Sequence, residues 1–245
     1  MPILRSSEGR FLNKAPCFII HKRPYKEHDF LLELFTLEYG RISAVCHQGR
    51  KSSFRQGALL QSFVPLYLTL FKGRSELYNV SEVKRAGCSF KLGLPKLFCA
   101  QYLNELIYRL CHEEESDPQL FAAYLKTLSI LEQDIDPRLH LRRFETVLLN
   151  TLGYALSFED NQGRPFSKEN FYTFDPHAGF RLCQDPSLAS YKGETLADIA
   201  QGKLSSGESL AVLKRIHSQI LQMLMNYRPL QSHKLYSQYL SMQEI

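Results

Sequence analysis

The sequence predicts an α+β protein, with a small β-barrel at the N-terminus and a mostly helical region after it. Residues 15–85 contain five short strand-like segments, and the apolar spacing becomes helical after residue 95. The charge changes at about the same point. Residues 1–85 hold 14 Lys and Arg against 7 Asp and Glu, whereas residues 86–245 hold 16 against 18. We therefore expect a basic barrel domain at 15–85 and a helical domain at 86–245, preceded by a disordered or extended tail at 1–14.

Turn and breaker residues separate the expected strands, which are Cys17–Lys22, Asp29–Thr36, Arg41–His47, Ser62–Phe71 and Glu76–Lys84. The fourth has the clearest period of two, with an aliphatic face (Val64, Leu66, Leu68, Leu70) and an aromatic face (Phe63, Tyr67, Phe71). The aliphatic face should form the core. Either the helical domain or stacked bases should cover the aromatic face, and we favour the helical domain. Five short strands with brief connections favour a closed OB-fold barrel, a frequent nucleic-acid platform, although a fold alone does not establish function.

Three helices are expected after the barrel, joined by short turns and packed as an antiparallel bundle. The second and third should begin at Asp117-Pro118 and Asp136-Pro137, where an N-cap residue precedes a first-turn proline. An irregular insert follows at 154–192, with a small hairpin expected from Phe171–Phe174 and Phe180–Cys183. Further helices are expected at Ser209–Tyr227 and Ser232–Leu240.

Sequence signals for catalysis, metal binding and membrane insertion are missing. The six cysteines form no CxxC pair, the histidines have no i,i+4 ligand spacing, and the usual nucleotide-binding and hydrolase motifs do not occur. The acidic run Glu113, Glu114, Glu115 and Asp117 is typical of a solvated connection between helices. No apolar run approaches the roughly 20 residues of a membrane-spanning helix, and no secretory signal is recognisable. We therefore expect a cytoplasmic, non-catalytic protein without cofactor or metal.

Basic turns make the barrel a candidate for binding nucleic acid. The segment GRKSSFRQG places Arg50, Lys51 and Arg55 around Phe54, which could stack on a base or anchor the loop. A second basic turn contains Lys22, Arg23 and Lys26, a third contains Lys72 and Arg74, and Arg41 begins the third strand. Cations in three turns of one small domain favour a phosphate-binding groove.

The helical region contains a second candidate binding element. Arg142 and Arg143 are adjacent on an otherwise apolar helix, and Arg138, Arg142 and Glu145 have the spacing of an intrahelical ion network. Alternatively, an arginine there lines an apolar groove and receives a carboxylate from a partner peptide.

Five segments in order resemble the RecO family of bacterial recombination mediators. They are HKRPYKEHDFLLELFTLEYGRI (21–42), GALLQSFVPLYL (57–68), YLNELIYRL (102–110), LRRFETVLLNTLGY (141–154) and RPLQSHKLYSQYL (228–240). The resemblance extends over nearly the whole chain. It implies an OB-fold followed by a helical domain, binding of single- and double-stranded DNA, and ATP-independent annealing of complementary strands, in the cytoplasm at the nucleoid. It also implies binding of the acidic C-terminal tail of single-stranded DNA-binding protein (SSB), and cooperation with RecR to load RecA.

The resemblance also assigns residues. The basic positions at 49–55 match the family's basic barrel loop, and Arg142 and Arg143 match its arginine pair, with Arg142 favoured as the partner of the tail carboxylate. Some family members carry a four-cysteine zinc module after the LGY segment, whereas 154–192 has only Cys183 here. We therefore expect no zinc and a degenerate hairpin in its place.

Three other functions remain open from sequence alone. An OB-fold RNA-binding protein would show the same basic turns, because the barrel contains no diagnostic reader of the 2′-hydroxyl. A metal-dependent nuclease would shorten DNA in the presence of magnesium or manganese. A protein adaptor with an incidental basic face would bind partners without binding DNA.

Overall fold

The computed structural model describes residues 10–47, 58–73, 75–186 and 189–243. The chain divides into two compact units, one formed by Met1–Asp134 together with Leu230–Ile245 and the other by Ile135–Pro229. None of the helices in the described ranges is both long and apolar enough to cross a bilayer.

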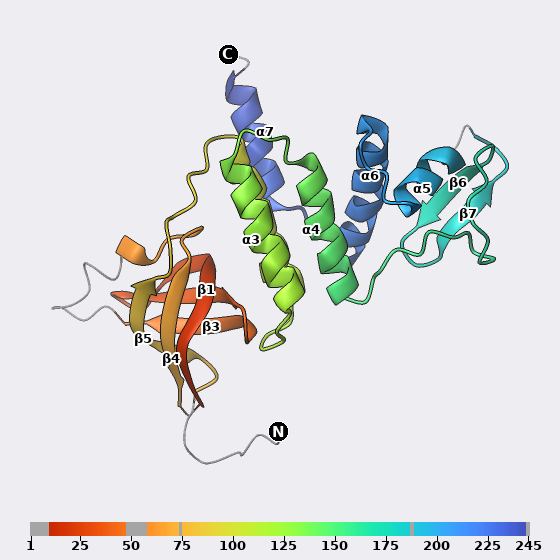
Figure 1. Ribbon diagram of the computed structural model, residues 1–245. Coiled ribbons are helices and arrows are strands. Elements are labelled where there is room, and N and C mark those ends of the chain that lie inside the picture. Colours follow the sequence, from red (N-terminus) through yellow and green to blue (C-terminus); the bar gives the residue numbers. More distant parts are fainter. Residues whose placement is uncertain (1–9, 48–57, 74, 187–188, 244–245) are drawn as a thin grey trace. The chain divides into compact units, whose positions relative to one another are not determined.

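Five strands form a closed barrel in the first unit, as the sequence predicts (Figure 1). They are β1 (Arg10–Tyr25), β2 (Asp29–Thr36), β3 (Gly40–Cys46), β4 (Leu66–Lys72) and β5 (Tyr78–Arg85), in the order β1-β2-β3-β5-β4. The β3–β5 pair is parallel and the other pairs are antiparallel. This is a barrel of the OB-fold type.

Strand β1 is 16 residues long and extends beyond both ends of the expected strand. Its first half pairs with β4, from Arg10 to Cys17, and its second half pairs with β2, from Cys17 to Tyr25. Residues 10–14, which the sequence assigned to a tail, therefore form part of the barrel wall. The strand can turn from one neighbour to the other because its register shifts between Leu12 and Ala15 and again between Ile19 and His21.

The two faces of β4 differ in burial. Leu66, Leu68 and Leu70 are fully buried in the barrel core, as predicted. Tyr67 and Phe71 point outward and are 41% and 43% exposed. The expectation that helices cover this aromatic face is wrong for the described part of the protein, because the helices cover a different side of the barrel. Phe63, expected on the same face, is instead buried ahead of the strand.

The first unit also contains the helices α2 (Lys96–Leu110), α3 (Pro118–Glu132) and α7 (Gln231–Gln243). The N-cap predicted for the second helix is confirmed, since the Asp117 carboxylate accepts hydrogen bonds from the backbone N–H groups of Gln119 and Leu120.

Helix α3 contacts the outer side of β1 and β2 through four aromatic rings. Phe121 and Tyr124 of the helix lie against Phe18 and Phe35, with ring centroids 5.2 to 5.9 Å apart. Phe18 and Phe35 are themselves directly opposite each other on the two strands. The side of the barrel that the helices cover is therefore the outer face of β1 and β2.

The second unit contains α4 (Arg138–Thr151), strands β6 (Phe171–Asp175), β7 (Gly179–Cys183) and β8 (Tyr191–Lys192), and helices α5 (Gly193–Ala200) and α6 (Gly207–Leu224). The predicted hairpin is confirmed as β6–β7. The three helices of the predicted bundle are divided between the two units: within the first unit α2 packs with α3 and α7, and within the second α4 packs with α6.

Candidate nucleic-acid interface

The β1–β2 turn presents an exposed group of cations at one end of β1. Lys22, Arg23 and Lys26 are all exposed around this turn. The Lys22 ammonium donates a hydrogen bond to the Leu60 carbonyl at 2.8 Å, which leaves it at the surface of the barrel. The Lys26 ammonium lies 5.4 Å from the centroid of the Tyr25 ring. Such a turn can contact phosphates without further rearrangement.

The most basic predicted segment, with Arg50, Lys51, Phe54 and Arg55, lies outside the described residues. Its assignment to DNA binding stays a prediction. Described residues on both sides of this basic segment contact the β1–β2 turn or its strands. His47 Nδ1 lies 2.7 Å from Asp29 Oδ2, and the Leu60 carbonyl accepts the hydrogen bond from Lys22. His47 and Leu60, which flank positions 48–57 in the sequence, therefore both lie beside the β1–β2 turn or its strands.

Lys72, the described cation of the third basic turn, lies apart from the β1–β2 turn. Lys72 is paired in register with Arg10 at the start of β1, whereas the β1–β2 turn follows the end of that strand. The Lys72 ammonium contacts Glu114 Oε1 at 2.5 Å and lies 4.9 Å from the centroid of the Tyr78 ring. Its charge is thus already compensated. Arg74 lies outside the described residues.

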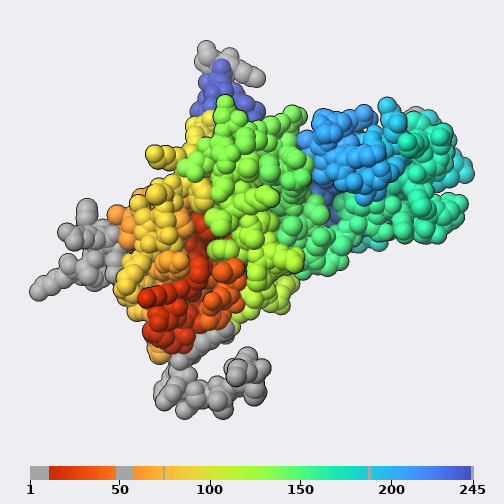
Figure 2. Space-filling model, viewed as in Figure 1, coloured from red at the N-terminus to blue at the C-terminus, as the bar shows by residue number. Residues whose placement is uncertain are grey.

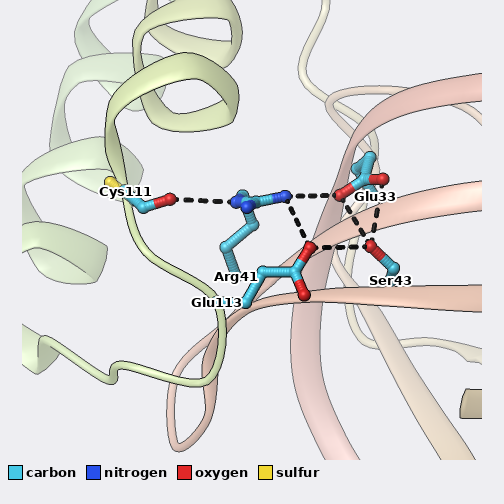
Figure 3. Close-up of polar contacts among 5 residues, drawn as sticks. All are labelled: Glu33, Arg41, Ser43, Cys111 and Glu113. Carbon is cyan, nitrogen blue, oxygen red and sulfur yellow. Dashed lines mark hydrogen bonds and ion pairs between the residues drawn. The ribbon is translucent and has the colours of Figure 1, made fainter. Parts of the chain in front are cut away.

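Arg41 is held in a network between the barrel and the connection that follows α2 (Figure 3). Its Nη1 lies 2.9 Å from Glu33 Oε2 and 3.2 Å from Glu113 Oε1, and its Nε donates to the Cys111 carbonyl at 3.0 Å. Ser43 Oγ lies within hydrogen-bond distance of both carboxylates, 3.1 Å from Glu33 Oε1 and 3.2 Å from Glu113 Oε1. Only 15% of the Arg41 side chain is exposed. These contacts give Arg41 a structural role and argue against a direct phosphate contact.

The composition of the acidic connection between α2 and α3 suggested a solvated segment. In the structure, however, several of its carboxylates have partners within the protein. Glu113 neutralises Arg41, Glu114 neutralises Lys72, and Asp117 caps α3. The backbone of this connection also lies close to the barrel. At Gly40, the first residue of β3 with φ of +62°, an added Cβ would lie 1.8 Å from the carbonyl oxygen of Glu115 in this connection.

In the second unit, the arginines expected to receive a partner peptide differ in burial. Arg142 is buried, and its Nη2 forms an ion pair with Glu145, the intrahelical pair that the spacing predicted. Glu145 Oε2 also lies 2.8 Å from Nδ1 of the buried His217 on α6. Arg138 pairs with Asp136 at 2.7 Å rather than joining this network, and Arg143 is exposed.

Two nitrogen atoms in this network have no hydrogen-bond partner among the described residues. They are Nε of Arg142 and Nε2 of His217, both buried. The sequence did not reveal His217 as a member, because it is 72 positions from Glu145 and no short spacing links them. A buried donor without an acceptor is costly, so the Arg142 Nε–H group has an unmet hydrogen bond.

The described residues contain no group of three or more His, Cys, Asp or Glu side chains that could hold a metal ion. The hairpin of the insert instead buries aromatic side chains. Phe180 is 1% exposed and contacts Phe166 and Phe174, with centroids 5.0 and 4.8 Å apart.

A closed OB-type barrel with an exposed basic turn, followed by helices, defines a class rich in nucleic-acid-binding proteins. Two family models match this chain: "Recombination protein O N terminal" over residues 12–87 and "Recombination protein O C terminal" over residues 93–224. The chain belongs to the RecO family of DNA repair proteins.

Curated relatives match over most of their length. The chain is 34% identical to the DNA repair protein RecO of Pseudoalteromonas atlantica, over 90% of this chain and 92% of the relative. It is 34% identical to that of Methylococcus capsulatus, over 89% and 90%. It is also 34% identical to that of Coxiella burnetii, over 90% and 96%.

Proposed function

We propose that this protein is a non-enzymatic recombination mediator that binds single- and double-stranded DNA through its barrel and anneals complementary strands without ATP. The observation that most supports this proposal is the arrangement at one end of the barrel. Lys22, Arg23 and Lys26 are exposed there, and the described residues His47 and Leu60, which flank the basic 48–57 segment in the sequence, contact this turn or its strands. The proposed DNA site therefore consists of the β1–β2 turn together with Arg50, Lys51, Phe54 and Arg55.

Annealing by such a site needs no catalytic residue. Two DNA strands repel each other through their phosphates, and a surface that neutralises both lowers the free energy of bringing them together. Neutralisation releases condensed counterions, so the affinity should decrease steeply as salt is raised. The surplus of positive charge in residues 1–85, 14 cations against 7 anions, supplies the required field.

The helical region would then direct the barrel to its substrate. We propose that the acidic, apolar-tipped C-terminal tail of SSB binds near α4, where Arg138 and Arg143 are at the surface and the buried Arg142 Nε has no acceptor among the described residues. Two weak contacts on one chain reinforce each other through effective concentration. Together with RecR, the protein would help load RecA on SSB-coated DNA, in the cytoplasm at the nucleoid.

Annealing of complementary oligonucleotides tests this proposal, with naked and SSB-coated DNA and across a salt series. We expect the protein to accelerate annealing at low salt, and Arg50→Ala combined with Lys51→Ala to remove most of that acceleration. The matched control is Lys192→Ala with Lys203→Ala, which removes the same charge from exposed side chains of the second unit. Equal loss in both double variants would show that only net charge matters. Shortened DNA in the presence of magnesium would instead identify a nuclease, and preference for matched RNA an RNA-binding protein.

A further inference from the structure

The face of an OB-fold that usually binds oligonucleotides is formed by strands 2 and 3. In this protein that face is occupied by other parts of the chain. Phe35 of β2 is 2% exposed beneath the rings of α3, and Arg41 of β3 is bound to the α2–α3 connection. Glu33, on the same outer face, is also buried. Bases therefore have no access to the outer face of β2 and β3.

A different outer face of the barrel, on β1, β4 and β5, carries exposed aromatic rings. Phe11, Tyr67 and Phe71 are 59%, 41% and 43% exposed. Phe11 and Phe71 are directly opposite each other on β1 and β4, so their side chains leave the same face as neighbours. The space-filling view shows strand β1, in red, and the yellow strands together at the surface of this unit (Figure 2). Single exposed aromatics are common, but three on one sheet face require an explanation.

Cations lie between and beside these rings. Lys14 occupies the bulge of β1, with φ of +52°, and is exposed between the Phe11 and Tyr67 ends of the face. Lys84 is directly opposite Tyr67 on β5. Glu82 on β5 lies beside them, and its pKa is lowered by its hydrogen bond from Lys84 and, to a smaller extent, by the charge of Lys14. Lys84 and Glu82 form an ion pair at 2.7 Å, so Lys14 supplies the surplus positive charge of this group.

We infer that this aromatic face, formed by Phe11, Lys14, Tyr67, Phe71 and Lys84, is a stacking platform for the unpaired bases of single-stranded DNA. The inference rests on the proposed function and specifies where single strands are bound. Tyr67 and Phe71 are four residues apart on one strand, which corresponds to about 13 Å at the usual rise. A single strand crossing the face can thus place bases on both rings while its phosphates meet the lysines.

The chemistry of the face selects single strands over duplex. Stacking on a protein ring requires a base whose π face is free, and in a duplex the neighbouring bases already cover it. Gly73 allows the Phe71 ring to lie close to the following turn, since an added Cβ there would be 3.2 Å from Phe71 Cε1. The Phe71 side chain nevertheless remains 43% exposed. The platform adds affinity for unpaired bases to the phosphate contacts of the basic turns.

The absence of tryptophan from the sequence allows a direct test. A Tyr67→Trp variant contains a single tryptophan, whose fluorescence should be quenched when bases of an oligonucleotide stack on it. We expect quenching by a single strand, and little or none by a duplex or by an abasic strand of the same charge. The matched control is Tyr227→Trp, in an exposed position of the second unit, where no quenching is expected. Equal quenching by single strand and duplex would contradict the inference.

Affinity measurements complete the test. Phe71→Ala and Tyr67→Ala, both at exposed positions, should each weaken single-strand binding about fivefold or more, because base stacking contributes about 1–3 kcal/mol per base. Duplex binding should change less than twofold. If DNA binding persists but these variants bind single strands normally, the inference fails and the proposed function stands. If they bind DNA normally but lose a protein partner, the face is a protein-docking surface and the inference is wrong. If the unaltered protein binds no DNA, the proposed function itself fails.

Discussion

Removing the carboxylate of Glu145 should strongly destabilise the second unit. Glu145 is 1% exposed and is bonded on one side to Arg142 and on the other to His217, which are 7% and 1% exposed. Glu145→Ala would leave the Arg142 guanidinium buried without a counter-charge and His217 Nδ1 without its partner. Breaking a buried ion pair by removing one member costs about 3–5 kcal/mol. We therefore expect the free energy of unfolding to decrease by about 4 kcal/mol.

Urea denaturation followed by circular dichroism measures this loss. With a slope of about 2 kcal/mol per molar urea, a loss of about 4 kcal/mol lowers the midpoint by about 2 M. Arg142→Met combined with Glu145→Leu should be less destabilising than Glu145→Ala alone, because an apolar pair leaves no unpaired charge. A midpoint shift below about 0.5 M for Glu145→Ala, which is about 1 kcal/mol, would refute the reasoning. So would a double variant less stable than Glu145→Ala.

The same structure supports three further predictions. Gly40→Ala should lower the free energy of unfolding by roughly 1 kcal/mol or more, because the added Cβ would lie 1.8 Å from a backbone carbonyl oxygen. A urea midpoint equal to that of the unaltered protein would contradict this. Tyr124→Phe should cost about 1–2 kcal/mol in urea denaturation, because it deprives the buried Asn104 of its 2.7 Å hydrogen bond. Burial raises the pKa of Cys17, so peptide mapping after brief alkylation should find Cys88, which is exposed, modified first and Cys17 unmodified.

The barrel was predictable from sequence because its core depends on local alternation. Leu66, Leu68 and Leu70 repeat every second residue, and burial follows that period. The full length of β1 was not predictable, since its two register shifts interrupt the alternation where the strand changes neighbour. The sequence did not predict helix α5 either, because its eight residues are too few to show a clear helical period.

The side of the barrel that the helices cover could not be read from the sequence. Phe35 and Tyr67 are both outward aromatic residues on regular strands, yet one is 2% exposed and the other 41%. Phe35 is buried because it contacts Phe121 of α3, a residue that is far from both Phe35 and Tyr67 in the sequence. The basic turns show the same limit. Arg41 and Arg23 look alike in sequence, but Arg41 meets Glu33 of the neighbouring strand and Glu113 of a distant connection.

The salt dependence of single-strand binding tests the central claim, that the cations at one end of the barrel bind phosphates, most directly. Fluorescence anisotropy of a labelled oligonucleotide gives the affinity at each salt concentration. The logarithm of affinity should fall linearly with the logarithm of salt, and Arg50→Ala with Lys51→Ala should reduce the slope by about 1.4, at about 0.7 per phosphate contact. Failure of the unaltered protein to bind at low salt, or an unchanged slope in the double variant, would contradict the claim.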